Sequence, residues 1–257
     1  MSKALITNLR KLGRKKYRMQ QRQFVAEGLR TVGQIIANKT IVIEYLVFDE
    51  SVGLWEDAAF SGLNKSVKDL RLPHRTFIEL SDTSTPQGVL AVCRMPEPSN
   101  PATFRNMQGC LIALNRIQDP GNAGTILRTA SWFGACGLLC DEGTVDLFHP
   151  KVVRSTAGAT GSLAWWVGDL EEALAELESH HWKSYVLDAG EHSLPLKMTK
   201  RGLKSILVVG NEAAGLDKAL IKDHRPQIKI PGGENHPAVE SLNASVALSI
   251  ALYEFMR

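Results

Sequence analysis

The chain has 257 residues, of which 44% are hydrophobic and 22% charged, and its formal net charge is +3. This is the composition of an ordinary globular protein, and the length suits one large domain or two modest ones. No apolar run reaches the ~18 residues of a membrane span, and the basic N-terminal stretch lacks the apolar core of a secretory signal. These features argue against a membrane-spanning or secreted protein, and we expect a cytoplasmic one.

Basic residues cluster near the N-terminus. Residues 10–22 read RKLGRKKYRMQQR and contain no acidic side chain. Such clustering creates a local positive field suited to a polyanion, whereas the alternative is a solvated helix face. The candidate contacts are Arg10, Lys11, Arg14, Lys15, Lys16, Arg18 and Arg22.

The first 95 residues predict a small α/β domain. Strand-like patterns cover residues 23–28, 43–50, 74–82 and 88–94, and a helical apolar spacing covers 29–39. The stretch SDTSTPQG, at 81–88, is a polar turn cluster between two of the predicted strands.

A proline-rich stretch then predicts a linker over residues 96–104. Pro96, Pro98 and Pro101 fall in RMPEPSNPATF, which has little apolar content. We expect neither a regular helix nor a central strand there. The sequence therefore predicts a domain at 1–95, a linker at 96–104 and a second domain at 105–257.

The second domain alternates predicted strands and helices. Alternation of this kind is typical of a mostly parallel sheet with helices on both faces. Asp169 is a plausible N-cap of one helix, and the closing helix is apolar around much of its surface, which favours contact with a further neighbour such as another chain. The predicted strands are 110–115, 137–142, 184–190, 204–212 and 227–231; the predicted helices are 125–135, a segment within 149–159, 169–182 and 242–257.

Four cysteines are present, and none forms a CxxC pair. Each lies in or beside an apolar run, so we expect buried free thiols, with a disulfide or metal role as the alternative. They are Cys93, Cys110, Cys136 and Cys140.

Three loops follow predicted strands, where parallel α/β sheets bind their ligands. In the first, NRIQDPGNAGTILRTA, Asn122 offers a donor and an acceptor, and Arg128 lies on the following helix, where it can point back to the loop. Arginine suits the forked recognition of phosphate. The structural alternative is a plain turn followed by a surface arginine.

The second loop, LVVGNEAAGL, ends a strand at Gly210 and then presents Asn211 and Glu212. The structural alternative is a strand that runs into a helix cap. The third loop, IKIPGGENHPAVESLNASVA, places Ser241 and Asn243 at the start of the closing helix, where polar side chains cap free N–H groups. Its structural alternative is capping alone.

Several common motifs are absent from the sequence. No GxGxxG follows a strand and no G-K-[ST] phosphate loop occurs, so a nucleotide-dependent α/β enzyme of another class is a poor alternative. No histidine and cysteine cluster has zinc spacing, and we expect no metal. His180 and His181 are expected at the surface, while His236 lies in the third loop, where it could touch a ligand.

Together the three loops resemble the motifs of the SpoU/TrmH group of the SPOUT RNA methyltransferases. The stretches KYRMQQRQFVAEG and TSTPQGVLAV resemble the L30e-like substrate-binding domain often attached to this group. The stretch PGGENHPAVES, between Ile230 and the end of the loop at Ser241, is longer than the corresponding stretch expected in this family. The matching positions are Asn122 and Arg128 in the first motif, Gly210 and Glu212 in the second, and Ile230, Ser241, Leu242 and Asn243 in the third.

The resemblance implies a SPOUT domain with a deep trefoil knot, a homodimer, and S-adenosylmethionine as cofactor for ribose 2′-O-methylation of RNA. Ribosomal RNA is the expected substrate, with tRNA as an alternative and a non-catalytic RNA-binding protein on the same scaffold as another. The implied cofactor contacts are Gly210, Asn211, Ile230 and Leu242; the implied catalytic residues are Asn122, Arg128, Glu212, Ser241 and Asn243.

Two interpretations of Arg128 remain open, a general base and an orienting group. An ordinary arginine side chain loses its proton only above about pH 12, whereas an efficient base titrates near the working pH. We therefore favour orientation and charge stabilisation. Beside such a domain, the basic run at 10–22 is expected to bind RNA.

Overall fold

The structure is a computed structural model that describes residues 3–61, 63, 66–190, 192–199, 201–233 and 241–256. Residues 234–240 of the third loop, which include His236, lie outside the described residues. Contacts divide the chain into two compact units. The first holds residues 1–97 and 146–162, and the second holds 98–145 and 163–257. Segment 146–162, which the sequence places in the second domain, therefore packs with the N-terminal residues.

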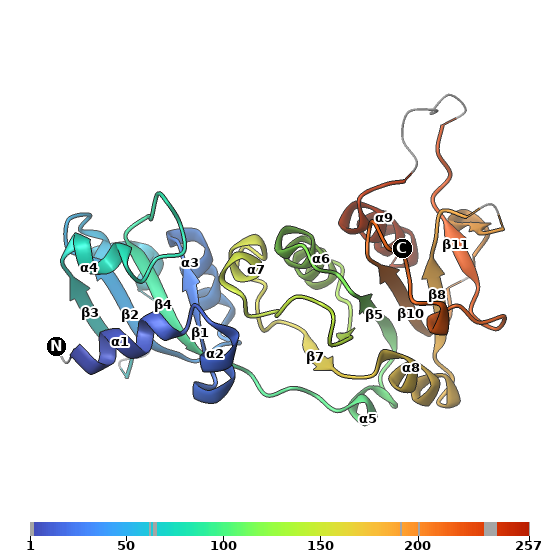
Figure 1. Ribbon diagram of the computed structural model, residues 1–257, viewed down its shortest axis with the longest axis horizontal. Coiled ribbons are helices and arrows are strands. Elements are labelled where there is room, and N and C mark those ends of the chain that lie inside the picture. Colours follow the sequence, from blue (N-terminus) through green and yellow to red (C-terminus); the bar gives the residue numbers. More distant parts are fainter. Residues whose placement is uncertain are drawn as a thin grey trace. The chain divides into compact units, whose positions relative to one another are not determined.

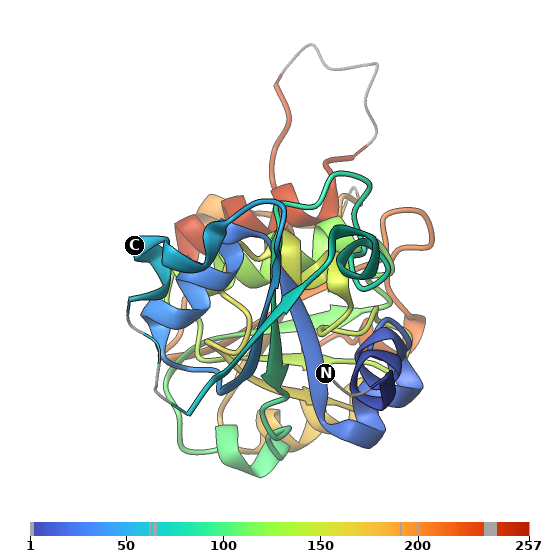
Figure 2. The same cartoon turned by 90° about the vertical axis from the view of Figure 1, so that its left-hand side faces the viewer.

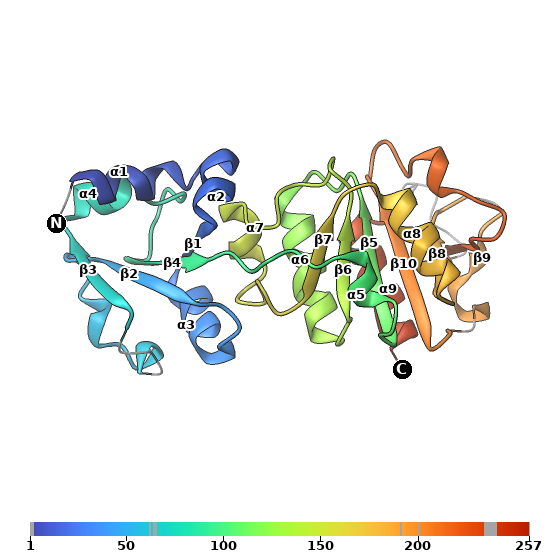
Figure 3. The ribbon, with the colours of Figure 1, turned by 90° about the horizontal axis from the view of Figure 1, so that it is seen from below.

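The first unit is built on a four-stranded mixed sheet of order β1-β4-β2-β3. Strands β1 and β2 run antiparallel to β4, and β3 runs parallel to β2. Helices α1 and α2 lie on one side of this sheet and α3 on the other (Figure 2, Figure 3). The elements are α1 (Lys3–Lys11), α2 (Lys15–Gln21), β1 (Gln23–Glu27), α3 (Leu29–Asn38), β2 (Ile43–Asp49), η1 (Leu54–Glu56), η2 (Ala58–Phe60), β3 (Lys68–Leu72), α4 (His74–Ile78), β4 (Val89–Arg94) and α7 (Pro150–Ser155).

The strands expected at 23–28, 43–50 and 88–94 are confirmed, as is the helix expected at 29–39. The prediction of a strand at 74–82 is wrong, because residues 74–78 form the short helix α4. Pro73 precedes α4, and Phe77 is its fully buried residue. Strand β3 was missed, since KDLRL places two leucines between charged side chains, a pattern too short to stand out.

Segment 146–162 packs closely on the first unit. The rings of Phe148 and Phe24 lie 5.1 Å apart between centroids. Asn38 donates a hydrogen bond of 3.0 Å to the carbonyl oxygen of Gly158. Gly158 has a φ of +96°, and a Cβ atom added there would lie 2.3 Å from Cβ of Gln34. A glycine is therefore required at this position for two reasons, its backbone conformation and its close approach to α3.

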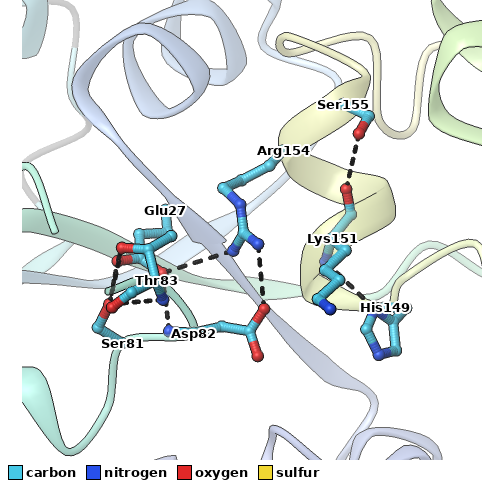
Figure 4. Close-up of polar contacts among 8 residues, drawn as sticks. All are labelled: Glu27, Ser81, Asp82, Thr83, His149, Lys151, Arg154 and Ser155. Carbon is cyan, nitrogen blue, oxygen red and sulfur yellow. Dashed lines mark hydrogen bonds and ion pairs between the residues drawn. The ribbon is translucent and has the colours of Figure 1, made fainter. Parts of the chain in front are cut away.

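Polar contacts also attach this segment, as Figure 4 shows. Arg154 donates to Asp82 over 3.1 Å and lies 3.8 Å from the buried carboxylate of Glu27. Glu27 in turn accepts hydrogen bonds from the loop at 81–83. Charged groups therefore join β1, the 81–83 loop and α7.

His149 caps α7 by accepting a hydrogen bond from the N–H of Lys151. Burial together with the charge of Arg18 lowers the pKa of His149.

The second unit contains, among the described residues, a seven-stranded sheet of order β7-β6-β5-β10-β8-β11-β9 in which every recorded pairing is parallel. Helices α6 and α9 lie on one side of it, and α5 and α8 on the other (Figure 1). The elements are α5 (Pro101–Phe104), β5 (Gly109–Asn115), α6 (Pro120–Trp132), β6 (Gly137–Cys140), β7 (Ala164–Val167), α8 (Leu170–Ser179), β8 (Lys183–Leu187), β9 (Leu194–Pro195), η3 (Leu196–Met198), β10 (Lys204–Gly210), η4 (Lys218–Leu220), β11 (Gln227–Lys229) and α9 (Ala244–Phe255).

The parallel α/β architecture expected for this part is confirmed. Asp169 caps α8 as expected, by accepting from the N–H of Glu172. Helix α6 begins five residues earlier than expected, because Asp119 caps it and Pro120 suits its first position. The expected linker contains the one-turn helix α5, capped by Asn100. None of the helices in the described residues is long and apolar enough to span a membrane.

The cysteines are free thiols, as expected. Three of them are buried and Cys136 is partly buried. Burial raises the pKa of Cys136 to about 11 and that of Cys110 to about 12. It raises the pKa of Cys93 and Cys140 as well. The raised pKa values favour the protonated thiols at neutral pH.

Replacing Gly158 by alanine tests the close approach of segment 146–162. A suitable control is Gly134→Ala, because Gly134 also has a positive φ (+72°) but has no atom within 4 Å of an added Cβ. Both substitutions incur the left-handed backbone cost of about 1–2 kcal/mol. Gly158→Ala should lose about a further 1–3 kcal/mol through overpacking against Gln34. Chemical denaturation of both variants measures this difference, and equal losses would contradict the packing described.

Candidate active site

The site lies where strands β5 and β10 end side by side. These strands pair in parallel register, with Asn115 opposite Gly210. The loops that follow them therefore leave the sheet at the same edge. The first loop leads into α6 and the second carries Asn211 and Glu212, so two of the three predicted loops are brought together by strand pairing.

Glu212 connects the three predicted loops. Its Oε1 accepts a hydrogen bond of 2.8 Å from the amide of Asn122. The same oxygen accepts from the amide of Asn243 and, over 3.0 Å, from the N–H of Ala244. Asn243 also donates to Oδ1 of Asn122 over 3.0 Å. Three residues that are far apart in the sequence thus form one closed polar cluster, Asn122–Glu212–Asn243.

The capping expected for Asn243 is confirmed. Its Oδ1 accepts from the N–H of Ser245 over 3.0 Å and from the N–H of Val246 over 3.3 Å. Asn243 therefore begins helix α9 with its oxygen and binds Glu212 with its nitrogen. The capping that the sequence offered as the structural alternative is therefore present, and it does not prevent the same side chain from contacting Glu212.

A cavity of about 770 Å³ opens beside this cluster. Its lining includes Gly210, Asn211, Glu212, Ile230, Ser241 and Leu242, all of which were predicted site residues. The lining also includes Leu187, Asp188 and Ala189 at the end of β8, which sequence analysis missed. Their position at the carboxyl end of a parallel strand is the signal that could have identified them.

Gly210 shapes the wall of the cavity. A Cβ atom at this position would lie 2.7 Å from the carbonyl oxygen of Gly215 and 2.7 Å from a side-chain atom of Leu216. The backbone folds back here, since the N–H of Gly215 donates to the carbonyl oxygen of Asn211 over 2.9 Å. Asn211 stabilises this turn by accepting from the N–H groups of Ala213 and Ala214. Only glycine leaves the turn its present shape.

Arg128 lies on α6, six residues after Asn122, and its side chain is exposed. Within the described residues it has no recorded hydrogen bond or ion pair. Ser241 is likewise exposed at the cavity. These side chains are therefore available to a ligand, whereas Asn122 and Asn243 are already engaged with Glu212.

The basic run belongs to the first unit and divides into two groups. Arg14, Lys15 and Lys16 are exposed. Arg18, in contrast, is 1% exposed and forms a buried ion pair of 2.6 Å with Asp146. Its expected contact with a polyanion is therefore wrong, because its charge is used to hold segment 146–162. Arg10 pairs with Glu79, Lys11 lies over the ring of Tyr17, and Arg22 pairs with Glu97.

No group of histidine, cysteine and acidic side chains within the described residues has an arrangement that could hold a metal ion.

Comparison with known proteins identifies the family. Residues 109–253 match the SpoU rRNA Methylase family, and residues 3–91 match the MRM3-like substrate binding domain. The chain belongs to the SpoU rRNA methylase family. The 23S rRNA (guanosine(2553)-2′-O)-methyltransferase RlmP of Bacillus subtilis is 32% identical over 248 residues, which cover 96% of this chain and 94% of that protein.

Solved structures agree over almost the whole chain. A putative RNA methyltransferase of the TrmH family from Porphyromonas gingivalis superposes with a TM-score of 0.82 at 28% identity, covering 99% of this chain and 98% of that one. An AdoMet-bound rRNA methyltransferase from Sinorhizobium meliloti superposes with a TM-score of 0.83 at 25% identity, covering 98% and 94%. The fold is therefore shared over almost the whole chain.

Gly210→Ala tests whether the cavity wall binds the cofactor. The added methyl group collides with Gly215, so the turn must move and affinity for S-adenosylmethionine should fall about tenfold or more. Gly202→Ala is the matched control, because its nearest neighbours lie at ordinary contact distances and it does not line the cavity. Titration calorimetry with S-adenosylmethionine measures both variants. Unchanged affinity in Gly210→Ala would show that the ligand binds elsewhere.

Proposed function

We propose that this protein transfers the methyl group of S-adenosylmethionine to a ribose 2′-hydroxyl of RNA, with ribosomal RNA as the substrate. The observation that carries the proposal is the Asn122–Glu212–Asn243 cluster beside the cavity at the carboxyl edge of the parallel sheet. Support also comes from the relatives, because the Bacillus subtilis protein is named as a 23S rRNA 2′-O-methyltransferase.

The cavity fits the cofactor by size and by chemistry. Its volume of about 770 Å³ lies within the range of about 300–1,000 Å³ typical of small-molecule sites. Gly210, Ile230 and Leu242 offer backbone groups and apolar surface for the adenosine part, while Asn211 keeps the turn in place. When bound, S-adenosylmethionine supplies an electrophilic methyl group.

The other site residues act on the RNA side. Glu212, held by three donors, fixes the first and third loops relative to the cavity. Arg128 is exposed, and its guanidinium can contact an RNA phosphate and the ribose hydroxyl together. Ser241 offers a hydroxyl at the cavity. In this proposal Arg128 orients the nucleotide and stabilises charge rather than removing the proton.

The two parts of the chain divide the work. We assign residues 1–95 to RNA binding, 96–104 to a linker and 105–257 to methyl transfer, in keeping with the family matches at 3–91 and 109–253. Within the last range, segment 146–162 packs with the first unit. The exposed cations Arg14, Lys15 and Lys16 supply a positive surface for the RNA backbone. The ribosomal substrate also motivates the proposed cytoplasmic location.

We further propose a homodimer with a knotted C-terminal segment. Helix α9 exposes Val246, Ile250 and Tyr253 at 45%, 37% and 48%, and Trp132 at the end of α6 is 82% exposed. Helices α6 and α9 pack together, so these side chains offer an apolar surface to a second copy.

Arg128→Lys distinguishes orientation from proton removal. Lysine keeps the positive charge but cannot bind with two parallel N–H groups as the guanidinium does. We therefore expect the methylation rate to fall about tenfold or more and to stay nearly constant between pH 7 and 9. Single-turnover assays on the RNA substrate measure the profile. The exposed Arg75→Lys serves as the control. A rate that rises tenfold per pH unit to the wild-type value would instead support a general base.

Neutralising the basic surface tests RNA binding. The triple variant Arg14→Gln, Lys15→Gln and Lys16→Gln should bind RNA more weakly, and the salt dependence of its affinity should decrease by about 0.7–0.9 per lost phosphate contact. The control neutralises Lys183, Lys197 and Lys218, which are exposed cations outside the domain assigned to RNA binding. Filter binding across a salt series measures the slope. Equal affinities for the triple variant and the wild type would refute this surface.

The whole proposal is tested by mapping 2′-O-methylation across total RNA in a strain that lacks the protein. Loss of one ribosomal methyl group, restored by the wild-type protein but not by Arg128→Ala, is the expected result. If no methyl group is lost from the RNA of this strain and the protein shows no detectable binding of S-adenosylmethionine, the protein is instead a non-catalytic RNA-binding protein.

A further inference from the structure

Asn115, the last residue of β5, pairs in register with Gly210 of the proposed cofactor site and is not one of its predicted residues. It is 1% exposed, although it is polar. Its neighbours along the edge of the sheet are Gly210 at the end of β10 and the residues that follow β6. A buried amide must find partners for all its hydrogen-bonding atoms, and the partners of Asn115 reveal what it holds.

Both ends of the Asn115 amide bind Asp217. Its Nδ2 donates to Oδ2 of Asp217 over 2.8 Å, and its Oδ1 accepts from the backbone N–H of Asp217 over 2.8 Å. The remaining amide hydrogen is donated to Oδ2 of Asp141 over 2.7 Å. The geometry is a two-point clamp on one residue, and every donor of the side chain is used.

Arg116 holds the other end of the same turn. Its carbonyl oxygen accepts a hydrogen bond of 3.0 Å from the side chain of Asn211, and its guanidinium pairs with Asp217. Arg116 has a φ of +53°, which is a left-handed conformation. The backbone N–H of Arg116 donates a hydrogen bond to the carboxylate of Asp141, which stabilises this conformation. The two residues at the end of β5 therefore bind both the first and the last residue of the 211–217 turn.

This turn contributes Asn211, Glu212, Gly215 and Leu216 to the wall of the cavity. Residues 212–215 are exposed, so packing against the core does not determine their positions. Their positions depend on the hydrogen bonds to Glu212, on Leu216, which packs against the core, and on the polar contacts at the two ends of the turn. Asn115 itself does not line the cavity, and it can affect a ligand there only through the turn.

We propose that Asn115 is a positioning residue for the cofactor: its clamp on Asp217, with Arg116 on Asn211, sets the 211–217 turn in the shape that binds S-adenosylmethionine. This inference rests on the proposed function and adds a residue to it. It assigns to the end of β5 a role in cofactor affinity, separate from the RNA contacts of the loop that follows.

Asn115→Asp tests the clamp with almost no change in shape. The substitution replaces the donor by an acceptor, so two hydrogen bonds to carboxylates become contacts between like charges. Affinity for S-adenosylmethionine should fall about tenfold or more. The KM for the cofactor should rise in parallel, while kcat at saturating cofactor and the affinity for RNA should change less than about threefold.

The double variant Asn115→Asp with Asp217→Asn supplies a rescue. In this variant the new amide at position 217 can donate to the new carboxylate at position 115, which reverses the direction of the native hydrogen bond. The net charge returns to its original value. We expect it to recover at least about threefold of the lost cofactor affinity. Asn100→Asp is the matched control, because the side chain of Asn100 is recorded only as an acceptor, from the N–H of Ala102 in α5.

Calorimetry, steady-state kinetics and thermal unfolding of the full-length protein decide the question. Unchanged cofactor affinity in Asn115→Asp, with or without a lower Tm, overturns the proposal, because a purely structural role predicts that result. Should this variant fail to fold, Asn115→Ser removes the clamp without adding charge, and the same criteria apply. Absence of cofactor binding in the wild type would overturn the proposed function as well, so the two failures are distinguishable.

Discussion

The parallel pairing of β5 with β10 is the constraint on which the rest of the site depends. Asn115 lies opposite Gly210, so the two loops that carry Asn122 and Glu212 leave the sheet next to each other although about 90 residues separate them. The sheet is buried on both faces by helices, and its strands therefore cannot slip without exposing core side chains. This register brings the polar residues within hydrogen-bonding distance.

Glu212 then fixes the positions of the neighbouring loops by hydrogen bonds. One carboxylate oxygen receives donors from α6, from Asn243 and from the start of α9. The negative charge lies at the N-terminus of α9, where the helix dipole favours it. The residues that close the site therefore also begin a helix, and the cavity beside them is shaped by a turn whose glycine allows the backbone to fold back.

Sequence patterns predicted most of the second unit, because strands buried on both faces have continuous apolar runs such as CLIALN and ILVVG. They failed at α4 and β3, which are short and only partly buried. They also failed at Arg18. Nothing in a run of basic residues distinguishes the side chain that meets Asp146, 128 residues away, from its exposed neighbours.

The sequence by itself determined the alternating α/β pattern, the three polar loops and the family motifs, since these depend on residue type and local spacing. Only the tertiary structure decided that Asn243 both caps a helix and binds Glu212, that segment 146–162 packs with the first unit, and that Asn115 clamps Asp217. Each of these depends on contacts between residues distant in the chain. Such contacts are set by strand register and side-chain packing, which local patterns do not encode.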